Sequence, residues 1–154
     1  WLADLVRLEW ARVEVFDAPD AEPLELDDLS AIPLSDWPAL RFRPIPACVI
    51  VESAWPVHEI WTAAGTAALD QVAPAPMVVR VWREGFSVSH AAMGEIERRA
   101  FPMLQHGESF AALCSAVDGD GDAAAHEIGA LLLRWLEDQL LARPLEPSPA
   151  VAPS

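Results

Sequence analysis

Apolar residues recur with helical spacing over residues 2–17, which predicts a helix. At about 100° per residue, Glu9 falls near the middle of a wide apolar arc. A carboxylate on an apolar arc is costly unless it is paired, so we expect Glu9 to pair with Arg12 or to accept a hydrogen bond from a neighbouring backbone. The side chains that form the arc are Leu2, Leu5, Val6, Leu8, Trp10, Val13, Val15 and Phe16, and the charged residues outside it are Asp4, Arg7 and Glu14.

The pattern between this helix and residue 72 is mixed. Pro44 and Pro46 exclude a helix around them. Cys48–Glu52 is a short apolar run rich in β-branched residues, which predicts a strand. Trp55-Pro56 then places a proline at the favoured first position of another helix, which carries Trp61.

The second half of the chain begins with a β-hairpin signal. Met77–Trp82 and Phe86–Ala91 flank the glycine-containing turn 83–85. Helical patterns follow this hairpin, and the last of them places Ile128 and Leu132 on its core face. The three helices are expected at about 94–105, from a cap at Ser109 onward, and at about 123–142.

Together these elements predict an α+β fold that is mostly helical. The small antiparallel sheet, made of the hairpin 77–91 and a strand near 48–52, is expected to pack on helices. Residues 1–72 would form a helical lobe with a short strand, and residues 77–142 a lobe of hairpin followed by three helices. The tail 143–154 has the composition of a disordered segment.

The charge of the chain excludes some classes of partner. The formal net charge is −14, and the ten basic residues are scattered. Binding to nucleic acid or to an anionic membrane depends on clustered lysine and arginine, so neither partner is expected. No signal peptide is visible and no apolar run approaches the roughly 18 residues of a membrane span, which makes the cytoplasm the expected location.

Catalytic and metal-binding motifs are not recognisable in the sequence. The four histidines and two cysteines do not fall at metal-ligand spacings. We therefore expect a chain that is not an enzyme, with no metal or other cofactor of its own. The seven tryptophans, in a chain without tyrosine, would lie either in the core or partly exposed at a contact surface.

Several short stretches together resemble the HvfC/BufC-type family, whose older label is putative DNA-binding domain, and more distantly the partner subunit of methanobactin biosynthesis. The resemblance covers residues 1 to about 142, without the helical domain that usually precedes this region in the family. Where the family often has His-Pro, this chain has Ile45-Pro46. The stretches are Leu2-Ala-Asp-Leu-Val-Arg-Leu-Glu-Trp-Ala11, Phe16-Asp-Ala-Pro-Asp20, Pro23-Leu24, Asp36-Trp-Pro38, Trp55-Pro-Val57 with Ile60-Trp61, and Val81-Trp-Arg83.

The resemblance implies a partner subunit of a multinuclear iron-dependent oxidase that modifies ribosomally made precursor peptides. The iron would belong to the oxidase, with which this chain would form a heterodimer, and this chain would help to bind the peptide leader. A DNA-binding transcriptional regulator remains the alternative, although a recognition helix should be basic. The last predicted helix and its end carry Arg134 and Arg143 against Glu127, Glu137 and Asp138.

An extended leader could add to a strand edge of the hairpin, because such an edge offers unpaired N–H and C=O groups. Arg80 and Arg83 are rare positive charges in this chain and are candidate anchors for acidic leader residues; alternatively, both are solvated and the chain itself covers the edge. Trp55 and Trp61 are candidate contacts with the oxidase, or else core residues. The other candidate leader contacts are Val79, Val81, Val88 and His90 of the hairpin, with Ile128 and Leu132 in an adjacent helix groove.

Overall fold

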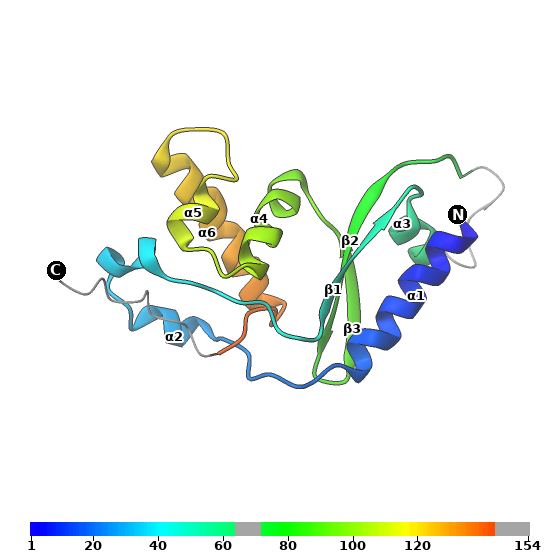
Figure 1. Cartoon of the computed structure of the whole chain (residues 1–154), viewed down its shortest axis with the longest axis horizontal. Coiled ribbons are helices and arrows are strands. Elements are labelled where there is room, and N and C mark those ends of the chain that lie inside the picture. Colours follow the sequence, from blue (N-terminus) through cyan, green and yellow to red (C-terminus); the bar gives the residue numbers. More distant parts are fainter. Residues whose placement is uncertain (64–71, 144–154) are drawn as a thin grey trace. The chain divides into compact units, whose positions relative to one another are not determined.

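The fold was obtained as a computed structural model, which describes residues 1–63 and 72–143 (Figure 1). Apart from Arg143, the tail that was expected to be disordered lies outside the described residues. The chain forms two compact units, and each is assembled from two separate stretches. Unit 1 comprises Trp1–Asp20 and Pro46–Gly94, and unit 2 comprises Ala21–Ile45 and Glu95–Ser154.

The fold class is the predicted one, a mostly helical α+β fold with a small antiparallel sheet. The two units do not follow the two lobes expected from the sequence. The strand near residue 50 pairs with the hairpin, so these elements share one unit. The helices after the hairpin instead share a unit with residues 21–45.

Unit 1 is built on a three-stranded antiparallel sheet in the order β1 (Cys48–Ser53), β2 (Met77–Glu84), β3 (Ser87–Ala92). The turn between β2 and β3 places Gly85 at φ 55, a left-handed conformation that glycine adopts without steric cost. Val81 pairs with Val49 of β1 on one side and with His90 of β3 on the other. The hairpin is therefore not an exposed pair of strands: β2 is central, and the outer edges belong to β1 and β3.

α1 (Leu2–Asp17) lies along one face of this sheet (Figure 1). Its inner residues Leu8, Ala11 and Val15 are buried in one core cluster with Val79 and Val81 of β2. The short helix α3 (Val57–Thr62) adds Val57 to the same cluster. Burial of aliphatic side chains of this size stabilises a fold by about 1.5–3 kcal/mol each, so this cluster holds the helix on the sheet.

Asp4 joins the inner face of α1, although the helical pattern placed it outside the apolar arc. It is only 6% exposed. Its carboxylate accepts hydrogen bonds from Ser53 Oγ at 3.1 Å and from the Ala54 amide at 3.0 Å, and it forms an ion pair with Arg7. These donors compensate the loss of water around the carboxylate and tie the start of α1 to the end of β1.

Unit 2 is helical, and local capping accounts for several of its helix ends. The Ser109 side chain accepts a hydrogen bond from the Ala112 amide at 3.2 Å, as its predicted cap role requires. Gly107, after the helix Glu95–Gln105, has φ 68, which fits a left-handed residue at a helix end. No described helix is both long enough and apolar enough to cross a membrane. The helical elements are α2 (Leu26–Ser30), the 3-10 helix η1 (Leu34–Ala39), α4 (Glu95–Gln105), α5 (Phe110–Cys114) and α6 (Gly121–Glu137).

The last helix ends earlier than the predicted residue 142. Gln139 adopts φ 53, and the Leu140 amide donates to the Trp135 carbonyl at 2.8 Å, which is the hydrogen bond of a Schellman-type end. The next residues run between two other segments of unit 2. The Leu24 amide donates to the Leu141 carbonyl at 2.7 Å, and the Ile45 amide donates to the Leu140 carbonyl at 2.8 Å.

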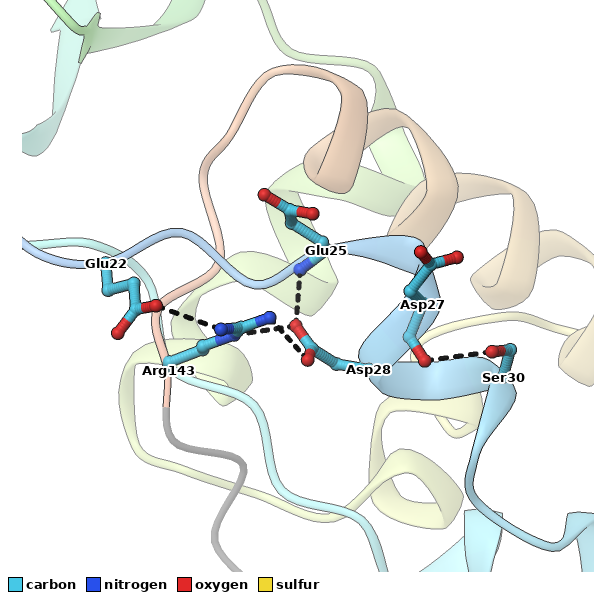
Figure 2. A network of polar contacts seen from close by, with 6 residues as sticks. All are labelled: Glu22, Glu25, Asp27, Asp28, Ser30 and Arg143. Carbon is cyan, nitrogen blue, oxygen red and sulfur yellow. Dashed lines mark hydrogen bonds and ion pairs between the residues drawn. The ribbon is translucent and has the colours of Figure 1, made fainter.

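Arg143 fastens this last segment through charged hydrogen bonds (Figure 2). Its guanidinium donates to Asp28 at 2.7 Å and to Glu22 at 2.9 Å. The Glu25 amide also donates to the Asp28 carboxylate, at 2.9 Å, as part of the capping box that begins α2. The backbone hydrogen bond from Glu25, followed by Arg143, lowers the pKa of Asp28 below its ordinary value.

The core of unit 2 contains one buried polar contact that can be tested. Trp135 is fully buried, and its indole Nε1 donates to Glu97 Oε1 at 3.0 Å. We expect Trp135→Phe to lower the free energy of unfolding by about 1–3 kcal/mol, because it removes this donor from a buried carboxylate. Urea denaturation followed by circular dichroism measures the change.

Trp37→Phe is the matched control, because the Trp37 indole is only part-buried and donates to the Ile32 carbonyl at a longer 3.4 Å. A smaller loss is expected there. Equal losses for the two variants would contradict the role given to the Trp135–Glu97 bond.

Candidate binding surface of unit 1

One helix across three strands leaves a groove on each side of α1. The first, called here the β1 groove, has a volume of about 490 Å³. Four successive residues of β1 line it, so the groove follows the outer edge of that strand. Its lining residues are Val6, Arg7, Trp10, Ala11 and Glu14 of α1 and Val49, Ile50, Val51 and Glu52 of β1.

The alternating hydrogen-bond pattern between β1 and β2 shows which backbone groups of β1 face outward. The Arg83 amide donates to the Ala47 carbonyl at 3.0 Å, and in an antiparallel pair the residues bonded to the partner strand alternate with residues that are not. Val49 and Val51 therefore direct their backbone groups to β2, whereas those of Ile50 and Glu52 point away from the sheet. No strand in the described part of the chain pairs with this edge.

The second groove, called here the α3 groove, lies on the opposite side of α1 and has a volume of about 390 Å³. It is bounded by α1, by α3 and by the other edge strand, β3. Its lining is mainly apolar, with one carboxylate and one guanidinium. The lining residues are Glu9, Arg12, Val13 and Phe16 of α1, Trp61 of α3 and Val88 of β3.

Arg12 and Trp61 of the α3 groove belong to a cluster of aromatic and basic side chains. Arg12 Nη1 lies 3.0 Å from His90 Nδ1, and the guanidinium lies 4.8 Å from the centre of the Trp61 ring. The His58 ring meets the His90 ring edge-on at 5.1 Å between centroids. Burial, followed by the charges of Arg12 and His58, lowers the pKa of His90 to about 4. Arg12 is thus directed to His90, and the expected Glu9–Arg12 pair is not among the ion pairs of the described residues.

Two of the candidate hairpin residues are associated with the α3 groove. Val88 lines it, and His90 contacts Trp61 and Arg12, which also line it. Val79 and Val81 are completely buried beneath α1. Side chains without exposed surface cannot contact an added peptide, so this part of the expected site does not fit the structure.

The two candidate anchoring arginines are engaged within unit 1. Arg80 is 2% exposed, with its guanidinium 4.4 Å from the centre of the Trp82 ring. Arg83 donates to the carbonyls of Val15 and Ala18, at 3.0 and 2.8 Å, and forms an ion pair with Asp20 at 2.8 Å. These contacts fasten the end of α1 to β2, and neither arginine is a solvated anchor for acidic residues.

The residues of the candidate helix groove are buried, whereas the candidate interface tryptophans are partly exposed. Ile128 and Leu132 belong to unit 2, where they are at most 2% exposed in its core. Trp55 and Trp61 are half-buried and pack against the core cluster of unit 1, so each has both core and surface character. Trp61 also lines the α3 groove.

The outer edge of β1 and the outer face of α1 were not predicted as binding surfaces from the sequence. Both could have been suspected: Cys48–Glu52 was a predicted strand, and the wide apolar arc of the first helix exceeds what one sheet can cover. The structure leaves Trp10, on the outer side of α1, 65% exposed. Its indole Nε1 donates to Glu14 Oε1 at 2.9 Å on the rim of the β1 groove.

The described residues contain no group of three or more histidine, cysteine, aspartate or glutamate side chains arranged to hold a metal ion. Cys48 and Cys114 are not disulfide-bonded, and burial raises the pKa of the Cys114 thiol. A raised pKa lowers the fraction of reactive thiolate at neutral pH.

The lowered pKa of His90 predicts a pH dependence of stability. Between about pH 6.5 and about pH 4 the unfolded chain takes up a proton that the folded chain does not, so stability is complete above this window and decreases as the pH falls through it. After allowance for solvent screening, we expect the free energy of unfolding to drop by about 1–2 kcal/mol from this group. Urea denaturation at neutral and mildly acidic pH measures the drop.

His90→Gln should reduce this drop, whereas His126→Gln, at an exposed position of α6, should leave it unchanged. The same drop in both variants would show that other groups cause the pH dependence.

No protein-family model matches this sequence, and no curated protein matches it. The resemblance to the HvfC/BufC-type family thus stays a prediction from the quoted stretches of sequence.

Proposed function

We propose that this protein is the non-catalytic partner subunit of a multinuclear iron-dependent oxidase and helps to bind the leader of a ribosomally made precursor peptide. The resemblance supports this proposal for the reaction and the partner, with the iron held by the oxidase. The grooves of unit 1 support it for the binding role. A cytoplasmic location belongs to the same proposal.

The observation that carries the binding role is the open edge of β1 beside a mainly apolar groove. An extended peptide can hydrogen-bond to the outward backbone groups of Ile50 and Glu52 and so add a fourth strand to the sheet. Alternate side chains of that peptide would then enter the β1 groove, where Val6 and Trp10 provide apolar contact. Backbone pairing supplies affinity for many sequences, and the groove supplies selectivity.

The charges around the β1 groove favour a neutral or basic leader segment. Arg7 is paired with Asp4, while Glu14 and Glu52 are exposed carboxylates on the rim. An acidic segment would place like charges together at this edge. We therefore place the leader at β1 and not at the hairpin, and we expect basic residues in the leader where the sequence had suggested acidic ones.

The binding role can be tested even though the precursor peptide is unidentified. A display library of random peptides of about 12 residues, long enough to span an edge strand, is selected on the full chain. We expect enriched peptides with alternating apolar residues, and hydrogen exchange should show added protection at Cys48–Ser53. Protection confined to unit 2, or no enrichment at all, would refute the proposed site.

A proline substitution distinguishes edge pairing from other modes of binding. Ile50→Pro removes an outward N–H from β1 and should weaken the selected peptides by about tenfold or more. Ala92→Pro is the matched control, because Met93 pairs with Val78 and the Ala92 N–H therefore also points outward, from β3. Fluorescence anisotropy measures both affinities, and equal weakening by the two variants would contradict pairing at β1.

A separate measurement tests the alternative that the protein is a DNA-binding regulator. A footprint on duplex DNA by the same full chain at physiological salt, together with failure of the peptide selection, would favour a regulator instead. The formal charge of −14 argues against that result, because it opposes the release of counterions that drives binding to DNA.

A further inference from the structure

The outer face of α1 carries a second apolar stripe that the fold does not cover. Leu2, Val6, Val13 and Phe16 are 62%, 55%, 53% and 52% exposed, respectively. Together with Glu9 they lie four, three, four and three residues apart along the chain. This is the heptad spacing of a helix that packs against another helix. We call these five residues the outer seam.

Large exposed apolar stripes on soluble domains mark contact surfaces. The inner face of α1 already packs on the sheet through Leu8 and Val15, so the seam is additional to what the fold requires. Both grooves flank it: Val6 also lines the β1 groove, and Val13 and Phe16 also line the α3 groove. A helix lying on the seam could place side chains into these hollows.

Glu9 at the centre of the seam determines which kind of helix fits. It is exposed, and no ion pair between described residues includes it, because Arg12 is directed to His90 and Trp61. A second copy of this chain would bring two Glu9 carboxylates together at the middle of a two-helix contact, in either orientation. The net charge of −14 on each copy adds to that repulsion.

We propose that the outer seam docks an amphipathic helix of a different protein, which places a lysine or arginine opposite Glu9. The apolar seam provides affinity, and the central carboxylate selects the partner and its register. This inference rests on the proposed function only in assuming that a separate protein partner exists. It assigns the contact with that partner to α1, whereas the candidates from the sequence were Trp55 and Trp61.

Two synthetic helices test the proposal on the full chain. Both are of about 24 residues, long enough to be appreciably helical, with leucine at the seam positions, and they differ only in a central lysine or glutamate. We expect the lysine helix to bind about tenfold or more tightly than the glutamate helix, by fluorescence anisotropy at low salt. Glu9→Lys should reverse this preference.

Glu127→Lys is the matched control, since it makes the same change in net charge at an exposed position within α6. It should keep the wild-type preference for the lysine helix. Binding of neither helix, equal binding of both, or a preference that Glu9→Lys leaves unchanged would overturn the proposal and reduce Glu9 to a residue that keeps α1 soluble.

The oligomeric state, measured by sedimentation, provides an independent test of the proposal. The wild-type chain should sediment as a monomer, and Glu9→Leu, which completes the apolar seam, should self-associate. A wild-type dimer would make a second copy the occupant and sink the inference. If neither synthetic helix binds but the selected peptides still bind at β1, only the proposed seam contact is refuted. If the lysine helix binds but Ile50→Pro does not weaken peptide binding, only the proposed leader site is refuted.

Discussion

The packing of Leu8, Ala11 and Val15 on Val79 and Val81 is the contact on which the rest of unit 1 depends. It buries β2, which is the central strand because it pairs with both β1 and β3, and it fixes α1 across one face of a sheet only three strands wide. A single helix cannot cover such a face from edge to edge. The same contact that stabilises unit 1 therefore leaves a groove on each side of α1, and one of these grooves is lined by the edge strand β1.

The arginines of unit 1 show how strongly this arrangement shapes the surface. Arg83 reaches the carbonyls at the end of α1, and Arg12 reaches His90 of β3. Both guanidinium groups hold elements of unit 1 together. Glu9 and Glu52 are exposed in the lining of the two grooves, and they favour ligands with neutral or basic side chains.

Local chemistry allowed much of the fold to be predicted from the sequence. The hairpin, the first helix and the cap at Ser109 each depend on residues that are close together along the chain. The central position of β2 depends on pairing with β1, across residues 54–76, and no local pattern reports such a contact. Val79 and Val81 were candidate contacts for the same reason: they would be edge residues in an isolated hairpin, but β1 and α1 bury them. The end of α6 was missed because Gln139, not glycine, adopts the left-handed conformation.

The composition of the outer seam is hard to attribute to the stability of α1. Valine at positions 6 and 13 is a poorer helix former than lysine, glutamate or alanine, by up to about 0.7 kcal/mol per residue. These side chains are more than half exposed, so they recover little of that cost by burial. Polar residues at the same positions would give a helix at least as stable and a more soluble surface. An apolar seam that neither helix propensity nor the core requires is best explained by a contact with another molecule, and the carboxylate at its centre limits which molecules can make that contact.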